Sequence, residues 1–267
     1  MKKFPAANLL PVFLLVVIFF TANAQKLPNV QQISVRAPVN IKIDGNADEW
    51  DNKFQAYNKA TDIYYTLANN DKILYLTIQT PDRVIMTKIM FGGLVFAINR
   101  SGKKDLKETV NITYPAFEKG KQNMVYIVYN ETKARPDSFA MVNNSQLAAK
   151  SKFIRVTGIK GIDTLISVYN QDGIKAVSSF DNKMVYTYEL AVDLSLLGLN
   201  VAKPEKFAYN IALPGLRPVT EELNKHGILL YYSFTPAAHS VSNPDNPHGY
   251  RVDVPTDFWG EYTLAEK

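Results

Sequence analysis

The residues best suited to ligand binding gather in one stretch, residues 214–257, which holds all three histidines of the chain. From His239 to Tyr250 it reads HSVSNPDNPHGY and lies outside any predicted strand. Proteins often carry their binding residues on such loops, because a rigid scaffold positions them. We therefore predict ligand contacts from Arg217, Tyr232, His239, His248 and Tyr250. The alternative is a surface loop that Pro244 and Pro247 keep turning.

These histidines carry no signature of a metal site. His239 and His248 lie nine residues apart, without the i, i+4 spacing of a helical metal site or a recognisable metal-binding string. The absence of cysteine excludes thiolate metal sites and a cysteine nucleophile. The metal ligands, if the protein has any, are therefore unknown from the sequence.

Catalytic motifs are also missing. The sequence contains no Gly-x-Ser-x-Gly elbow, no His-Glu-x-x-His, no Walker string and no Gly-x-Gly-x-x-Gly loop. We expect a non-catalytic protein. A glycan-processing role stays open as the alternative, because a sequence does not show whether two carboxylates stand at glycosidase separation.

Two tryptophans are candidates for stacking against a sugar ring. Trp50 follows a turn, and we expect it to fill the core, because tryptophan is strongly buried on average. Trp259 lies near the start of the last predicted strand, beside Gly260, where its ring suits either the core or an exposed platform. Trp259 is therefore the tryptophan that we assign to ligand binding, and a sugar site enclosed by two tryptophans is not predicted.

The first 24 residues have the layout of a secretory signal peptide. Lys2 and Lys3 form the positive region, residues 12–20 are an unbroken apolar run, and residues 22–24 (ANA) are a small-residue cleavage site before Gln25. The apolar run is much shorter than the roughly 20 residues that a membrane helix needs. We predict export to the periplasm or the extracellular space and no membrane span.

The charge balance argues against a nucleic-acid partner. Loss of Lys2 and Lys3 with the leader lowers the formal net charge from +5 to +3. Short basic clusters such as Lys103 and Lys104 are interrupted by acidic or apolar residues and form no dense patch for a phosphate backbone. The sequence does not indicate an oligomeric state.

The mature chain has the pattern of strands and turns. Short runs rich in Val, Ile, Tyr, Phe and Thr are separated by clusters of Gly, Asn, Asp and Pro. Predicted strands cover residues 40–43, 62–67, 72–79, 94–99, 123–130, 152–157, 164–169, 183–192, 206–213, 229–234 and 262–264. Helix is expected only in single turns, such as residues 194–197 and 220–225. We predict an all-β fold, an antiparallel β-sandwich of the immunoglobulin-like or jelly-roll type with long loops.

Alternation and turn residues refine this prediction. Within residues 183–192, Tyr186 and Tyr188 share one face with Leu190 and Val192, which predicts that one face of this strand is buried. Turn residues at 69–71, 171–173 and 181–182 predict hairpins. We expect a single domain over residues 38–265, preceded by an N-terminal extension over residues 25–37.

The most distinctive string is residues 43–50, IDGNADEW. It is not an EF-hand loop, because Glu49 stands where that loop needs glycine and Gln55 where it needs glutamate. From the residues, the string predicts a strand end, a turn with positive φ at the glycine and an aromatic plug. The residues that define this structural motif are Asp44, Gly45, Asp48 and Trp50.

This string resembles the opening of family 9 carbohydrate-binding modules and of the related DOMON-like sandwiches. Other landmarks of those domains have counterparts in the same order at residues 72–76, 80–82, 186–192, 197–199, 207–212 and 258–264. The resemblance spans residues 38–264, and residues 83–183 depart from it by their length.

The resemblance implies a β-sandwich that binds the ends of sugar chains between aromatic side chains. It implies a polysaccharide or oligosaccharide ligand and no catalytic cofactor, with calcium as a possible stabiliser of loops. Two alternatives stay open. One is an interaction or structural domain of the cell envelope that has lost the sugar site, and the other is a DOMON-like domain that binds haem.

Overall fold

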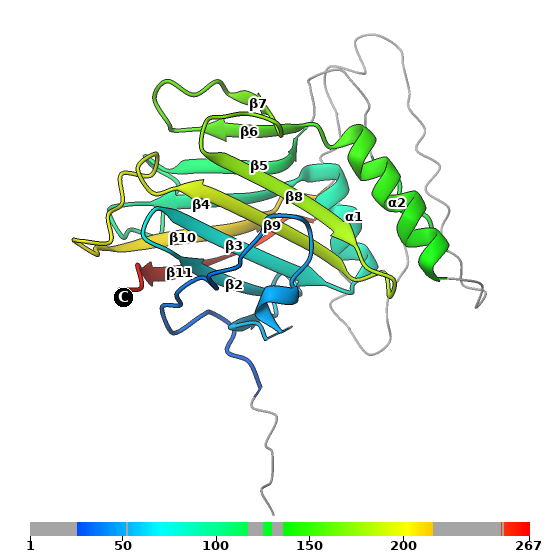
Figure 1. Cartoon of the computed structure of the whole chain (residues 1–267), viewed down its shortest axis with the longest axis horizontal. Coiled ribbons are helices and arrows are strands. Elements are labelled where there is room, and N and C mark those ends of the chain that lie inside the picture. Colours follow the sequence, from blue (N-terminus) through cyan, green and yellow to red (C-terminus); the bar gives the residue numbers. More distant parts are fainter. Residues whose placement is uncertain (1–25, 52, 117–124, 130–135, 216–251, 253) are drawn as a thin grey trace, which may run out of the picture.

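The computed structural model describes residues 26–51, 53–116, 125–129, 136–215, 252 and 254–267. Two sheets pack face to face (Figure 1). In spatial order, the first contains β1 (Ala56–Asn58), β2 (Ile63–Asn69), β3 (Ile73–Thr80), β9 (Tyr186–Asp193) and β8 (Ile174–Phe180). The second contains β11 (Thr256–Thr263), β10 (Lys206–Leu213), β4 (Leu94–Asn99), β5 (Val110–Ala116), β6 (Phe153–Thr157) and β7 (Leu165–Ser167). All strand pairs within these sheets are antiparallel, which confirms the predicted sandwich.

Several predicted strands differ from the structure. Residues 40–43 form no strand, and neither do residues 125–129, the described part of the strand predicted at 123–130. Residues 229–234 lie outside the described residues. The hairpin predicted at residues 171–173 is wrong, because β7 and β8 lie in different sheets and the chain crosses between layers there. The turns at 69–71 and 181–182 do join paired strands.

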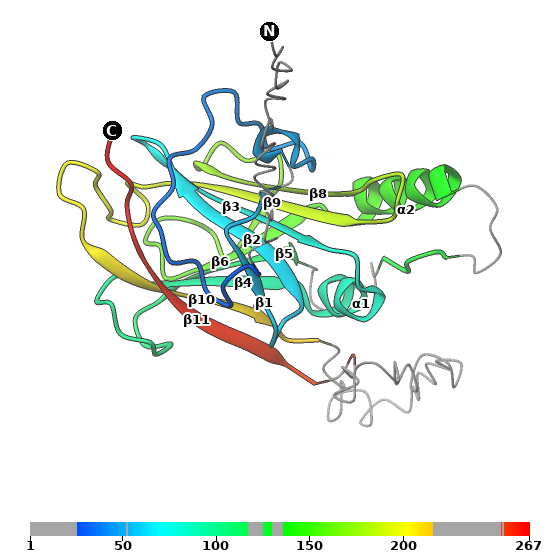
Figure 2. The ribbon, with the colours of Figure 1, turned by 90° about the horizontal axis from the view of Figure 1, so that it is seen from below.

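The prediction that helix is confined to single turns is wrong at two places. Helix α1 (Arg83–Gly92) begins after Asp82, whose carboxylate accepts the backbone N–H groups of Val84 and Ile85 at 2.8 and 3.0 Å. It lies at one end of the two layers (Figure 2). Helix α2 (Pro136–Lys150) packs against β8. A single 3₁₀ turn, η1, covers Asp48–Trp50, and the turn predicted at residues 220–225 lies outside the described residues.

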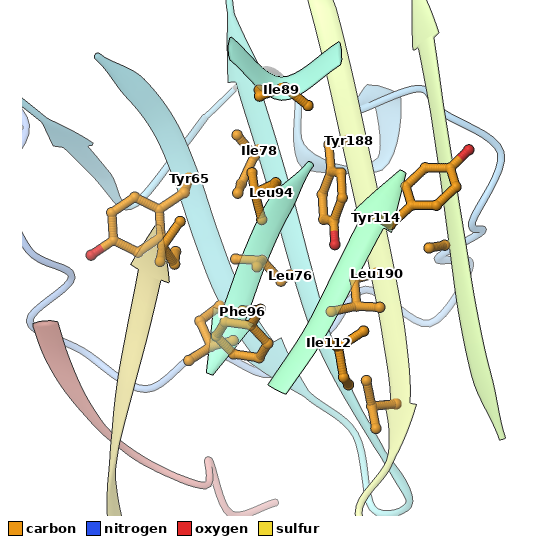
Figure 3. Close-up of a cluster of buried hydrophobic side chains, with 14 of the residues drawn as sticks. Tyr65, Leu76, Ile78, Ile89, Leu94, Phe96, Ile112, Tyr114, Tyr188 and Leu190 are labelled. Atoms are coloured by element: carbon orange, nitrogen blue, oxygen red, sulfur yellow. The ribbon is translucent and has the colours of Figure 1, made fainter. Parts of the chain in front are cut away.

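The main core fills the space between the sheets (Figure 3). Tyr188 and Leu190 point into it from β9, where they face Tyr114 and Ile112 of β5. The alternation of residues 183–192 therefore assigned the inward face correctly. The prediction that only one face of this strand is buried was wrong, because Glu189 and its neighbours on the outer face of β9 are buried as well.

A second, smaller apolar cluster lies on the outer face of the first sheet. Residues 38–51 and 53–55 lie over the first sheet and place Ala47, Trp50 and Phe54 against Ala68 of β2. Trp50 is only 7% exposed, the core position expected of it. Strands of the first sheet are thus covered on both sides, as in a three-layer arrangement.

The N-terminal segment, residues 26–37, joins the edges of the two sheets. The Gln31 side chain donates to the Leu67 carbonyl and accepts the Leu67 N–H on β2, both at 2.8 Å. Three residues later, the Ser34 hydroxyl donates to the Thr263 carbonyl on β11 at 2.6 Å. This segment, which the sequence suggested as an extension, is hydrogen-bonded to both sheets of the sandwich.

Candidate functional site

Strand β11 presents a row of side chains outside the core. Because successive residues of a strand face opposite sides, Phe258 and Tyr262 point into the core while Trp259 and Glu261 point outward. Gly260 is on the inward side, opposite Tyr209 in the register with β10. Trp259 is partly exposed, so it occupies neither a fully buried core position nor a fully open platform.

A groove of about 480 Å³ passes over this row. One side is formed by residues 30–34 of the N-terminal segment, the other by residues of β10 and β11 and by Lys104 from the loop after β4. Polar and charged side chains dominate its lining, and Trp259 supplies the one indole ring there. The lining residues are Val30, Gln31, Gln32, Ile33, Ser34, Lys104, Lys206, Trp259, Gly260, Glu261, Tyr262 and Thr263.

Two lysines share one carboxylate in the groove. The Nζ atom of Lys104 lies 3.0 Å from Glu261 Oε1, and that of Lys206 lies 3.1 Å from Glu261 Oε2. Hydrogen bonds from these two ammonium groups lower the pKa of the Glu261 carboxyl. All three side chains remain substantially exposed, so the cluster contributes little to stability but offers donors and acceptors to a ligand.

The wall opposite these charges is anchored rather than loose. Gln31 is buried, and its backbone N–H donates to the Tyr65 hydroxyl at 2.9 Å in addition to the side-chain bonds to Leu67. The Ser34 hydroxyl fixes the other end of the wall to Thr263. Affinity in such a groove loses little to the ordering of its walls, because they are already held.

Most residues that the sequence proposed for binding cannot be compared with this groove. Arg217, Tyr232, His239, His248 and Tyr250 lie outside the described residues. The predicted loop leaves β10 after Leu213 and returns at Thr256, and these two residues pair in register. The groove instead extends along β11 from Trp259 toward Thr263, away from those loop ends. Among the described residues, Trp259 is the one that belongs both to the prediction and to the groove.

The structural motif of residues 43–50 forms a turn against the first sheet and does not line the groove. Gly45 has φ +89° and approaches Ser179 so closely that a Cβ atom would lie 3.0 Å from the Ser179 side chain. The Asp44 carboxylate accepts the N–H of Asn46 at 3.0 Å, and Asp48 begins the 3₁₀ turn that leads to Trp50. The motif therefore fixes the covering segment in place.

The side chain of Glu189 on β9 binds the backbone of this turn. Its Oε2 accepts the backbone N–H groups of Asp44 and Gly45 at 2.9 and 2.8 Å. Burial raises the pKa of the Glu189 carboxyl to about 7, although both N–H groups act in the opposite direction. The arrangement is a buried structural contact, with no access for a substrate.

Within the described ranges, no three His, Asp or Glu side chains gather closely enough to hold a metal ion. In the same part of the chain, no helix is long and apolar enough to cross a membrane. No protein-family model, curated protein or solved structure matches this chain. The structure is thus a β-sandwich that carries a polar groove with one tryptophan along its edge strand β11.

Proposed function

We propose that this chain is an exported, non-catalytic carbohydrate-binding protein, and that the groove along β11 receives the glycan. The observation that carries the proposal is the position of Trp259, partly exposed in a groove that also contains Lys104, Lys206 and Glu261. A sugar offers an apolar C–H face and a rim of hydroxyl groups, and this combination of one aromatic ring with charged donors and acceptors matches both.

In this proposal, recognition breaks no bond. The sugar ring stacks on Trp259, and its hydroxyl groups exchange hydrogen bonds with the ammonium groups of the lysines and the carboxylate of Glu261. Charge-assisted hydrogen bonds of this kind are stronger than neutral ones. Export through a cleaved leader, with cleavage near Ala24 and Gln25, would bring the protein to glycans of the envelope or the surroundings.

The experiment is a binding titration of the mature protein against soluble polysaccharides and oligosaccharides, with calcium or with a chelator. Calorimetry measures affinity, and tryptophan emission reports the site, because the part of the signal that W259F removes belongs to Trp259. We expect a glycan to shift this emission to shorter wavelength and to protect it from iodide. W259A should weaken binding at least about tenfold, as for a residue central to an interface.

A pair of lysine variants makes the test specific. Lys206 lines the groove, whereas Lys203 lies three residues earlier, paired with Glu205 at 3.2 Å and outside the groove. K206M should weaken glycan binding and K203M should not. If a glycan binds and neither W259A nor K206M affects it, the groove is the wrong site.

The second candidate is a protein-interaction domain of the cell envelope. The burial of Trp50 favours it, because this leaves Trp259 as the single tryptophan that could contact a sugar. Absence of binding to every polysaccharide class, with a protein partner captured from the envelope, would replace the carbohydrate proposal with this one. A Soret band in the purified protein would instead indicate the haem-binding alternative.

A further inference from the structure

A second pocket, of about 260 Å³, lies at the opposite edge of the first sheet from β8. Its lining is Tyr57 of β1, Tyr64 of β2, Asp62 from the turn between these strands, and Pro81 and Asp82 from the junction of β3 with α1. None of the described residues that line the groove along β11 belongs to it. The two sites are therefore separate, and binding at this pocket does not depend on the carbohydrate proposal.

The two aromatic rings form a fixed corner. Tyr57 and Tyr64 are cross-strand partners, with ring centroids 4.6 Å apart and ring planes inclined by 41°. Phe54, which is buried in the second apolar cluster, supports Tyr64 at a centroid distance of 6.1 Å. The rings are thus held by packing before any ligand arrives.

Hydrogen bonds hold both acidic residues of the pocket in place. Asp62 has a φ of +49°, a conformation that Asp and Asn tolerate better than most residues. The Thr80 hydroxyl donates to the Asp62 carbonyl at 3.1 Å, and the Tyr57 hydroxyl donates to the Asp62 carboxylate. Asp82 is held as the N-cap of α1 by its bonds to Val84 and Ile85.

Among the residues that the structure describes, no cationic side chain lines the pocket beside these carboxylates. Arg83 follows Asp82 in the chain, but its guanidinium lies over the ring of Tyr129, 3.7 Å from the centroid, and it does not line the pocket. Part of the Asp82 charge is offset by the N-terminus of α1. Asp62 lies in a turn and has no such helix end, so it is the stronger anchor for a cation.

We propose that this pocket binds an alkylammonium group, of the kind carried by an amino sugar or a lysine side chain. The ammonium would lie against Asp62, and the attached carbon atoms on the faces of Tyr57 and Tyr64. A cation over a tyrosine face is attracted by the ring quadrupole, and a nearby carboxylate adds to this attraction. The volume is below the roughly 300 Å³ at which pockets for whole drug-sized ligands begin, which suits a single cationic group.

The test compares matched ligands by calorimetry on the mature protein. Glucosamine and Nα-acetyl-lysine amide carry the ammonium, whereas N-acetylglucosamine keeps the sugar ring without the charge. We expect millimolar binding of at least one cationic probe and at least tenfold weaker binding of N-acetylglucosamine at this site. Binding of glucosamine alone would indicate an amino sugar as the source, and binding of the lysine amide alone a protein side chain.

Variants then locate the site. D62N removes the charge, keeps a residue that tolerates positive φ and can still accept from the Tyr57 hydroxyl, so it should fold and weaken the cationic probe at least fivefold. Y64L should weaken it similarly. D172N makes the same substitution in the exposed turn before β8, near the opposite end of the sheet, and should have no effect. W259A should also have no effect, because Trp259 belongs to the other groove.

The proposal is overturned by either of two results. One is that neither cationic probe binds, and the other is that D62N and Y64L, folded by circular dichroism, bind the cationic probe as tightly as the wild type does. A glycan that still binds in the β11 groove in either case would show that the carbohydrate proposal stands independently.

Discussion

The hydroxyl groups of Tyr65 and Tyr209 lie 2.9 Å apart in the middle of the core and join the two sheets by a hydrogen bond. Tyr65 comes from β2 and Tyr209 from β10, and both side chains are fully buried. Burial raises the pKa of both phenols, so both stay protonated. The Tyr65 hydroxyl also accepts the backbone N–H of Gln31, which connects the wall of the groove along β11 to this contact.

The two phenylalanine variants at this contact should differ in cost. Y209F leaves the Tyr65 hydroxyl with its Gln31 partner, and we expect a loss of about 1 kcal/mol in the free energy of unfolding. Y65F leaves both the Tyr209 hydroxyl and the Gln31 N–H without their partner, and we expect about 2 kcal/mol. Urea unfolding measures both. The double variant serves as the control: a cost equal to the sum of the two would mean that the hydroxyls are not coupled.

Glu189 should make stability depend on pH. Its carboxyl has a pKa of about 7 in the folded protein and about 4.5 in the unfolded chain, so folding takes up a proton between these values. The stabilisation is complete below about pH 4.5, declines as the pH rises and is lost above pH 7. The shift corresponds to roughly 3 kcal/mol.

Denaturant unfolding across this pH range checks the prediction with two glutamine variants. E189Q cannot ionise and should remove this decline, whereas E261Q, at an exposed carboxyl whose pKa is lowered, should keep it. An unchanged decline in E189Q would mean that Glu189 is not its source.

Strands were predicted well from the sequence where apolar residues recur at every second position. The strand predicted at residues 206–213 coincides with β10, because the apolar side of this strand is read locally from every second residue. Helix α1 was missed although Asp82 and Gly93 are ordinary start and stop residues. Lys88 interrupts its apolar face, and a lysine there hides the helical pattern because lysine is almost never buried.

The groove could be predicted from the sequence only in part. Alternation along the last strand places Trp259 and Glu261 on one face, and that signal is local. Lys206 reaches Glu261 through the register of β10 with β11, and Lys104 through the loop that follows β4. No pattern within any one segment encodes these contacts, since they depend on which strands become neighbours.

Gly260 should tolerate no side chain. A Cβ atom there would collide with the ring of Tyr209, at 2.7 Å from Cε1 and closer still to Cζ and the hydroxyl oxygen, and the contact to Tyr65 holds that ring. We expect G260A to lower the free energy of unfolding by about 3 kcal/mol, the upper end of the usual cost of overpacked core substitutions. It should also disturb the emission of the adjacent Trp259.

A second glycine separates steric cost from backbone cost. Gly161 has a φ of +85°, and a Cβ atom there would meet nothing within 4 Å. G161A should therefore cost only about 1 kcal/mol, from the positive φ alone. Equal thermal midpoints for the two variants would contradict the collision at Gly260.

Lys88 should destabilise the protein at neutral pH. Its side chain is fully buried on α1, and its Nζ donates to the Thr256 hydroxyl at 2.8 Å. Burial lowers the pKa of its ammonium to about 8, against 10.5 in the unfolded chain. At a pH where the ammonium is charged, its burial therefore lowers the free energy of unfolding. The free energy of unfolding should therefore rise between about pH 8 and pH 10.5, and below pH 8 the full penalty of roughly 3 kcal/mol applies.

Replacement by an apolar residue of similar length should remove this penalty. We expect K88M to raise the thermal midpoint at pH 7 and to abolish the rise above pH 8, because a well-packed apolar side chain often replaces a buried charge with a gain in stability. K103M makes the same substitution at an exposed lysine and should change neither quantity. If K88M were less stable than the wild type at pH 7, the ammonium would have a compensating partner, and Lys88 would stabilise the protein instead of destabilising it.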